Sequence, residues 1–261
     1  MKSLRESLLD DDLIGKTDKI IKNEILDFLV ENYKGAYKMS KKPNKDGLYE
    51  VSCTKNVNII NNNVTSLTNG MFIWTEVGMD FNCAYCRNLI SLEGAPEKVG
   101  GTFNCMFCES LESLEGAPKE VGGDFNCAYC KNLASLKGAS EKVSIHFDCS
   151  NCHSLKSLDG APKEVGGDFN LGNCKKITSL EGAPKEVGGD FNFYGCEKIT
   201  SLKGSPEKVG RDFYCNDCSS LKSLKGAPKE VGWNFYCHGC KIKFTEDEVK
   251  KTSNVKGKIK C

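Results

Sequence analysis

The sequence VGGDFNCAYCKNLASLKGASEK at residues 121–142 is one copy of a unit that recurs along the chain every 22 residues. A fixed period of this length is typical of a solenoid, in which each repeat stacks only on its neighbours. The sequence therefore predicts one elongated, stacked domain. Its phenylalanine stands at eight positions with no insertion between them: Phe81, Phe103, Phe125, Phe147, Phe169, Phe191, Phe213 and Phe235.

Each repeat combines a short strand with segments that cannot be regular. The alternation of Phe125, Asn126 and Cys127 predicts a strand with two inward residues and one outward residue. Two glycines before the strand allow a tight bend and a close approach between coils. Proline, which fixes φ and lacks a backbone donor, occupies six of the seven slots equivalent to Ser140. We expect a parallel β-sheet on one face and an irregular, polyproline-like back.

The pattern resembles the leucine-rich repeat, which reads L-x-x-L-x-L-x-x-N/C-x-L over about 20 to 29 residues. The copy at residues 57–67, VNIINNNVTSL, carries Asn62 where later copies carry cysteine. The family uses asparagine or cysteine in this slot to bond the backbone of the bend. Repeats worded like SLEGAPKEVGG also look like those of short bacterial proteins and of uncharacterised proteins of tailed bacteriophages. The resemblance covers about residues 55–243 and implies a leucine-rich-repeat-like solenoid. The slots of the pattern fall on Val121, Phe125, Cys127, Cys130 and Leu133.

The ends of the array divide the chain into three parts. Residues 1–47 are interpreted as an N-terminal helical cap and linker, 48–243 as the solenoid of one degenerate and eight regular repeats, and 244–261 as a C-terminal cap and basic tail. The apolar face of residues 18–34 predicts a helix that ends near Gly35 and either caps the array or docks elsewhere. The first 15 residues are expected to be disordered. The run Thr245–Glu248 predicts a capping box, a helix to about Lys251 and a mobile tail beyond it.

The composition points away from several classes of partner. The 261 residues include 36 basic and 35 acidic side chains, for a formal charge of +1, which gives no argument for a nucleic-acid or membrane partner. No apolar run approaches the roughly 18 residues that span a bilayer. The N-terminus has acids where a signal peptide needs an apolar core. We therefore expect a cytoplasmic protein in a reducing compartment.

Sixteen cysteines need an explanation. One cysteine slot, that of Cys130, is filled in all eight regular repeats, whereas the slot of Cys127 holds Leu171 and Phe193 in two of them. Two C-x-x-C pairs could hold zinc, but an apolar residue can replace cysteine in a core and cannot replace a metal ligand. We therefore predict a buried ladder of free thiols with no metal or cofactor. Zinc binding, and disulfide or redox chemistry, are the alternatives.

The chain shows no catalytic set. Its three histidines, His146, His153 and His238, have no repeated acid and nucleophile beside them. There is no phosphate-binding loop, no dinucleotide fingerprint and no H-E-x-x-H motif. We therefore expect that the protein is not an enzyme.

Candidate binding residues come from the outward slots. Two slots after each strand vary while most other positions stay nearly constant, and exposed aromatic residues are enriched in binding hot spots. The polar rows beside the central phenylalanine are a further candidate, although their plainer role is to bond their neighbours. The predicted partner-binding residues are Tyr85, Met106, Phe107, Tyr129, Tyr194, Tyr214, Tyr236, Asp124 and Asn126.

These observations favour a noncatalytic protein-binding scaffold, preorganised by a rigid array so that little ordering entropy is lost on docking. The resemblance to phage and bacterial repeats suggests an adaptor or inhibitor that acts on a protein whose identity the sequence does not name. Two alternatives stay open. One is a self-associating structural component of a larger assembly, and the other is a cysteine-based metal or redox protein.

Overall fold

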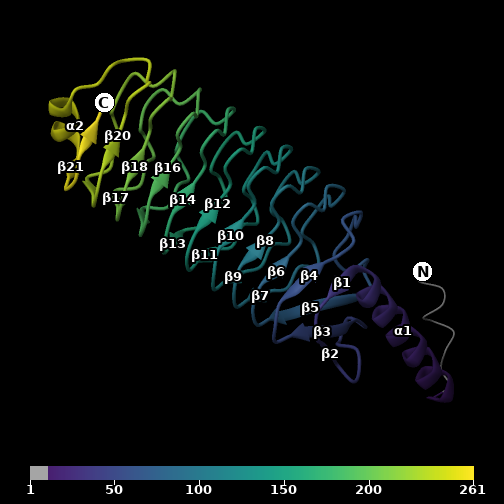
Figure 1. The fold of residues 1–261 in the computed structure, drawn as a ribbon. Helices are drawn as coiled ribbons and strands as arrows, with labels where there is room; N and C mark the ends of the chain where they lie inside the picture. Colours follow the sequence, from purple (N-terminus) through teal and green to yellow (C-terminus); the bar gives the residue numbers. More distant parts are fainter. Residues whose placement is uncertain (1–10) are drawn as a thin grey trace.

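The computed structural model describes residues 11–261, with side chains from residue 18 onward, and shows an elongated β-solenoid of about ten coils (Figure 1). Each regular repeat forms one coil, named below after its central phenylalanine. The predicted solenoid with parallel strands and helical ends is confirmed. The disorder expected for residues 1–15 falls largely outside the described residues, and positions 11–15 belong to a helix.

The sheet predicted from the Phe-Asn alternation runs the full length of the array and is called sheet A. Its regular strands pair in parallel and in register, so that Phe125 lies between Phe103 and Phe147. At the N-terminal end β1 pairs with β4 in antiparallel fashion. The strands, in spatial order, are β1 (Tyr33–Lys34), β4 (Val57–Ile59), β6 (Phe81–Asn82), β8 (Phe103–Asn104), β10 (Phe125–Asn126), β12 (Phe147–Asp148), β14 (Phe169–Asn170), β16 (Phe191–Asn192), β18 (Phe213–Tyr214), β20 (Phe235–Tyr236) and β22 (Ile259–Lys260).

A second sheet, sheet B, precedes the glycine bend of each coil and was not predicted. Its regular strands hold one exposed charged residue and one buried valine, a pattern too short to identify from periodicity. The rest of each coil is irregular, as expected. The strands, in spatial order, are β2 (Tyr37–Met39), β3 (Tyr49–Cys53), β5 (Phe72–Val77), β7 (Lys98–Val99), β9 (Glu120–Val121), β11 (Lys142–Val143), β13 (Glu164–Val165), β15 (Glu186–Val187), β17 (Lys208–Val209), β19 (Glu230–Val231) and β21 (Asn254–Val255).

Glycine at the bend between the two sheets is required by close packing of successive coils. A Cβ atom on Gly122 would lie 2.3 Å from the carbonyl oxygen of Gly100, which is closer than real contacts allow. Gly116, in the SLxGAP turn, has a φ of +86°, and a Cβ atom there would lie 2.4 Å from the backbone nitrogen of Glu93. The one non-proline residue in the proline slots, Ser140, is buried and donates its hydroxyl to the carbonyl of Pro118.

The core is a continuous spine of phenylalanine, cysteine, leucine and valine. All eight central phenylalanines are 0% exposed, and their rings follow one another at centroid separations of 4.8 to 5.9 Å. Full burial of a phenylalanine side chain stabilises a fold by about 1.5–3 kcal/mol. Repeated in every coil, this burial makes the 22-residue period the main stabilising feature of the chain.

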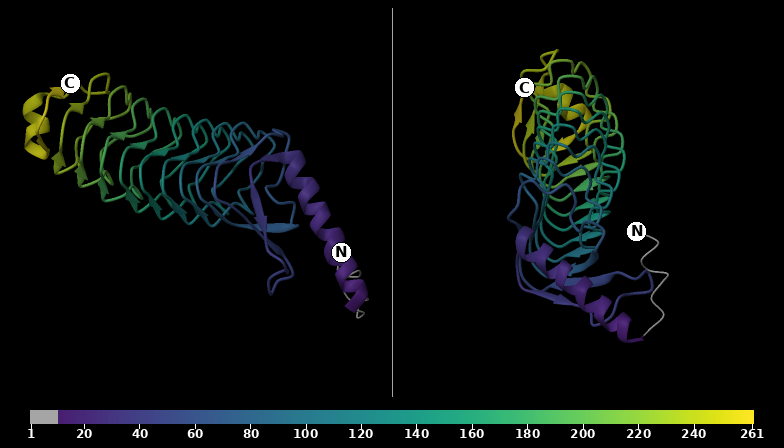
Figure 2. Two further views of the ribbon diagram at one scale, coloured as in Figure 1. Left: turned by 60° about the horizontal axis from the view of Figure 1, so that its bottom comes forward. Right: turned by 90° about the vertical axis from the view of Figure 1, so that its right-hand side faces the viewer.

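The N-terminal end is closed by helix α1 (Asp11–Asn32), which starts earlier than predicted. Ile25 and Leu29 are fully buried, and the Phe28 ring lies 6.1 Å from that of Phe72. The C-terminal part of α1 therefore acts as a cap, whereas its first turns extend beyond the body of the coils (Figure 2). The segment interpreted as a linker contains β2, which forms an antiparallel hairpin with β3.

The C-terminal end differs from the prediction in one respect. Helix α2 (Glu246–Thr252) has the expected capping box between Thr245 and Glu248. The tail beyond it is not free, because β21 pairs with β19 and β22 pairs with β20. The lysine-rich composition suggested mobility, but Val255 and Ile259 align with Val231 and Phe235 and add a further coil. None of the helices in the described part of the chain is long and apolar enough to cross a membrane.

Candidate functional site

The two cysteine slots have different roles in the structure. Seven of the cysteines in the slot of Cys130 donate a hydrogen bond to a backbone carbonyl of the preceding coil, at 3.1–3.3 Å from sulfur to oxygen. The acceptor residue lies in the slot of Cys127. Because that acceptor is a backbone atom, Leu171 and Phe193 serve as well as cysteine there. The donor slot needs a thiol, and the acceptor slot needs only an apolar side chain.

The prediction that Asn62 takes the place of the cysteine donor is wrong. Asn62 is exposed. Its neighbour Asn61 instead donates from its side chain to the Asn32 side-chain oxygen at 2.9 Å and accepts the backbone N–H of Asn63. The degenerate first coil thus bonds to the end of α1 through a different asparagine.

Burial makes most of the thiols unreactive. It raises the pKa of Cys127 and Cys152 well above the ordinary thiol value, and raises that of Cys86 to about 12. Metal binding and thiol exchange both require the thiolate. Within residues 18–261, no group of three or more histidine, cysteine or acidic side chains is arranged to hold a metal ion.

The C-terminal end is where the sulfur chemistry differs. Cys237 and Cys261, which are neighbours in the acceptor slot, form a disulfide with a Cα–Cα distance of 4.6 Å. Cys240 in the same region is only partly buried, and side-chain hydrogen bonding with Cys215 lowers its pKa. Within residues 18–261, Cys240 is the only unpaired cysteine that is not fully buried.

The polar rows of sheet A stabilise the fold. The Asp124 side chain accepts the backbone N–H of His146 in the next coil at 3.0 Å. In the same row His146 accepts the N–H of Asp168 through Nδ1, so this histidine takes the role of an aspartate. The Asn126 side chain accepts the N–H of Ala128 two residues later. Asp124 and Asn126 are therefore held by backbone bonds, and a binding role for them stays a prediction.

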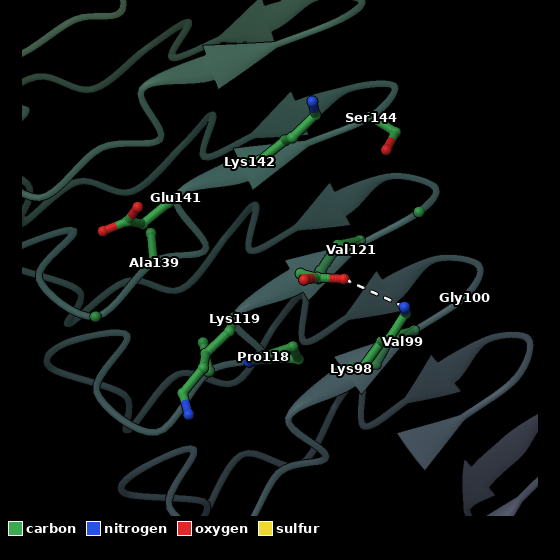
Figure 3. Close-up of a pocket in the computed structure, with 14 residues that line it drawn as sticks. Lys98, Val99, Gly100, Pro118, Lys119, Val121, Ala139, Glu141, Lys142 and Ser144 are labelled. Atoms are coloured by element: carbon green, nitrogen blue, oxygen red, sulfur yellow. Dashed lines mark ion pairs between the residues drawn. The ribbon is translucent and has the colours of Figure 1, made fainter. Parts of the chain in front are cut away.

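A hollow on the face of sheet B is lined by charged side chains of both signs (Figure 3). Lys98 pairs with Glu120 at 3.3 Å, and Lys119 pairs with Glu97 at 2.9 Å. These side chains are mostly exposed, so each pair adds no more than about 1 kcal/mol. The charged side chains of this hollow thus form solvated ion pairs between neighbouring coils.

The variable slot after the strand has an unusual backbone. In all eight regular coils its residue is left-handed, with φ between 56° and 69°. Asparagine, aspartate and glycine adopt this conformation readily, whereas other residues incur a cost of roughly 1–2 kcal/mol. Five coils carry such residues, and the first three carry aromatic ones. In chain order the slot holds Tyr85, Phe107, Tyr129, Asn151, Asn173, Gly195, Asp217 and Gly239.

The three aromatic residues of this slot form an outward stack, called here the aromatic ladder. The rings of Tyr85 and Phe107 are 4.8 Å apart at an interplanar angle of 11°, and those of Phe107 and Tyr129 are 4.5 Å apart at 12°. Tyr85 is 48% exposed and Tyr129 39% exposed. Met106, beside Phe107 in the chain, is half-buried. The structure thus brings together four of the predicted binding residues, Tyr85, Met106, Phe107 and Tyr129.

Of the three predicted binding tyrosines in the later coils, the structure brings together two. Tyr214 and Tyr236 stack at 4.6 Å with an interplanar angle of 6°. Tyr194 lies in a different slot, and its hydroxyl accepts a hydrogen bond from the Asn173 side chain at 2.6 Å. The sequence analysis missed Trp233, which is 50% exposed beside the tyrosine pair in the chain. The signal was present, since VGWN at residues 231–234 departs from the usual VGGD.

Comparison of the chain with protein-family models, with curated proteins and with solved structures finds no match.

Proposed function

We propose that the protein is a noncatalytic scaffold that binds another protein through the aromatic ladder. The observation that carries this proposal is the left-handed backbone at Tyr85, Phe107 and Tyr129. Strained residues of this kind cluster at functional sites. The other five coils show that the fold accepts asparagine, aspartate or glycine in the same slot. The aromatic residues are thus not required by the architecture, and partner binding gives a reason for them.

The geometry of the ladder suits a protein surface. Its three rings stack face to face, so that their edges form a row on the surface. Rigid aromatic side chains contribute contact area at low entropic cost. Beside it, Glu109 lies between Arg87 at 3.7 Å and Lys131 at 3.2 Å. This flanking row has two positive charges and one negative charge. The ladder would form the apolar centre of an interface and the charged row its polar rim.

The resemblance of the repeats to leucine-rich repeats supports the same proposal, because such solenoids bind partners with their stacked surfaces. The likeness to short bacterial and tailed-phage repeats suggests an adaptor or inhibitor acting on a host protein in the cytoplasm. The many unpaired thiols, 14 in all, are consistent with a reducing compartment.

The proposal is tested by a variant that replaces the ladder with the residue of the next two coils, Tyr85→Asn/Phe107→Asn/Tyr129→Asn. A matched control, Met79→Gly/Ile145→Gly, removes exposed apolar side chains from the bend row, where four of the eight regular coils carry glycine. Immobilised wild-type protein and control should capture the same protein from extracts of the source cells, and the ladder variant should not. The captured protein is then purified and its Kd measured by calorimetry. Equal capture by the ladder variant would reject the site.

Self-association is the alternative that the ends of the sheets favour. Within the described residues, β21 and β22 each have a strand neighbour on one side only, and an open strand edge can pair with another chain. Sedimentation over a concentration series separates the two functions. A mass that rises with concentration, together with capture of the same chain, would favour the structural role.

The cysteine-based alternative is supported only near Cys240, because every other unpaired thiol is buried. Metal analysis of protein purified under reducing conditions tests it. Zinc in molar proportion to the chain would favour this alternative over the binding scaffold.

A further inference from the structure

The outward face of sheet A changes character at its C-terminal end. In the first six regular coils the slots beside the central phenylalanine are held mostly by aspartate and asparagine, and the bend slot mostly by glycine. From the coil of Phe213 onward six of these nine slots hold cationic or aromatic residues, and the other three keep Asp212, Asn234 and Gly257. We call the group of six the C-terminal patch, and it consists of Arg211, Tyr214, Trp233, Tyr236, Lys258 and Lys260.

The side chains of the patch are arranged in two neighbouring rows of stacked groups. The guanidinium carbon of Arg211 lies 4.4 Å from the centre of the Trp233 ring. In the next row Tyr214 stacks on Tyr236, and the Lys260 ammonium lies 4.8 Å from the centre of the Tyr236 ring. Cation–aromatic contacts of this kind hold long, flexible side chains in place. The positive charges of Arg211 and Lys260 are therefore positioned before any partner arrives.

The one carboxylate among these nine slots, that of Asp212, is occupied by hydrogen bonds within the protein. Asp212 is 8% exposed, accepts a hydrogen bond from the Tyr214 hydroxyl at 2.9 Å, and accepts a second from the Asn234 side chain at 2.9 Å. Within residues 18–261, no carboxylate lies within 4.0 Å of the charged nitrogens of Arg211, Lys258 or Lys260. The patch thus presents three cations, of which Arg211 and Lys260 are held in place, and none has a carboxylate within ion-pair distance. The charge of Arg211 also acts on Asp190, which lies beyond that distance.

The fold does not require these residues. Gly189, Asp190 and Asn192 fill the corresponding slots one coil earlier and keep the same strand pairing. The cap of the array needs apolar residues on the inside, which Val255 and Ile259 provide through β21 and β22. The substitutions in the patch all face outward.

We propose that the C-terminal patch binds an acidic segment of a protein partner. Three unpaired cations attract carboxylates, and the edges of aromatic rings carry the positive part of the ring quadrupole. Nucleic acid fits less well. The faces of Tyr236 and one face of Trp233 are covered, which limits base stacking, and Asp168 and Asp190 continue the same row and would repel a long phosphate track. The patch is separate from the aromatic ladder and does not depend on it.

The proposal is tested with a fluorescein-labelled peptide of glutamate with interspersed tyrosine, by fluorescence anisotropy on the full chain. The variant Arg211→Gly/Lys258→Asn/Lys260→Asn restores residues that other coils carry. The control Lys222→Ala/Lys225→Ala/Lys241→Ala removes the same charge outside the patch. We expect wild-type protein to bind the peptide, the patch variant to lose about tenfold or more in affinity, and the control to lose less than about twofold. The single substitution Arg211→Gly should give an intermediate loss, and thermal unfolding verifies that each variant is folded.

Several outcomes would overturn this proposal. They are no peptide binding by the wild type, an equal loss in the control, binding of oligothymidylate of matched charge as tight as that of the peptide, or a change of oligomeric state in the patch variant. The last result would identify the patch as a contact between copies of the chain. The ladder variant should bind the acidic peptide like the wild type, so failure at one surface is distinguishable from failure at the other.

Discussion

Two ladders of aromatic rings run along this molecule, and they follow different rules. The inward ladder has one phenylalanine in every regular coil, each 0% exposed. The outward ladder has three rings, Tyr85, Phe107 and Tyr129, and stops where Asn151 takes the same backbone position. The inward ladder has a structural role, because every regular coil contributes a buried ring to it. The outward ladder is an addition to a position that other coils fill with residues better suited to it.

The outward ladder does not stabilise the fold on balance. A left-handed backbone costs a residue other than glycine, asparagine or aspartate roughly 1–2 kcal/mol. A stacked aromatic pair returns about 0.5–1.5 kcal/mol. Three strained residues therefore cost about 3–6 kcal/mol, and two stacked pairs return only about 1–3 kcal/mol. This balance separates the outward rings from the inward ones and favours a role in recognition.

The largest effect that we predict is the loss of folding stability at alkaline pH, where the thiols around the inward ladder ionise. Nine thiols that surround it have pKa values raised by burial or by neighbouring thiols. In the unfolded chain a thiol ionises near pH 8.5, so the stability from keeping it neutral is complete below that pH and is lost as the pH rises. One pH unit above that value each thiol costs about 1.4 kcal/mol, and nine together cost on the order of 10 kcal/mol.

The measurement is circular dichroism against pH between neutral and strongly alkaline solution, with a reducing agent present. We expect cooperative unfolding at mildly alkaline pH. The substitution Cys127→Leu, which copies Leu171, removes one ionisable thiol and should raise the pH of the midpoint. Unchanged stability through this range would show that the spine tolerates thiolates.

A direct comparison of the two ladders uses one phenylalanine from each. Phe125→Ala opens a cavity in the inward ladder and should lower the free energy of unfolding by about 3–5 kcal/mol. Phe107→Asn removes two stacking contacts but suits the left-handed backbone, so it should cost less than about 1.5 kcal/mol. Urea unfolding measures both values. Similar losses for the two variants would mean that the outward ladder is structural after all.

The smallest effect tests whether the outward ladder can be extended. Asn151→Phe adds a fourth ring beside Tyr129, and a double-mutant cycle with Tyr129→Asn isolates their interaction. We expect a coupling energy of about 0.5–1.5 kcal/mol. The net change in stability should be smaller, because the new ring also occupies a left-handed backbone. A coupling energy near zero would indicate that the stack is not set by the backbone alone.

The solenoid and its inward residues follow from the sequence because the 22-residue period repeats without interruption. Sheet B could not be predicted in the same way. A strand of two residues, such as Lys142–Val143, has no periodicity of its own and exists because the next coil supplies its partner. The tail was mistaken for a free end for the same reason, since Ile259–Lys260 forms a strand only beside Phe235–Tyr236.

The positions of the candidate site could be predicted from the sequence, but the backbone conformation and hydrogen bonds at these positions could not. Variation at the slot of Phe107 marked it as outward, and the aromatic cluster followed. The left-handed backbone of that slot was encoded in its other occupants, since Asn173, Gly195 and Asp217 are residues that favour positive φ. The constancy of the Cys130 slot likewise reflects a thiol donor to a carbonyl, which only the stacked coils reveal.

Because the repeats have a uniform length, the number of coils sets the distance between the aromatic ladder and the C-terminal patch. Three coils, those of Phe147, Phe169 and Phe191, separate the aromatic ladder from the coil in which the C-terminal patch begins. Each coil advances along the axis by about 4.8 Å, the distance between neighbouring strands. Gain or loss of one coil would shift the two surfaces relative to each other by that increment while leaving both intact. A partner that binds both surfaces would therefore depend on the number of coils between them. Duplication or deletion of a single repeat changes that number by one.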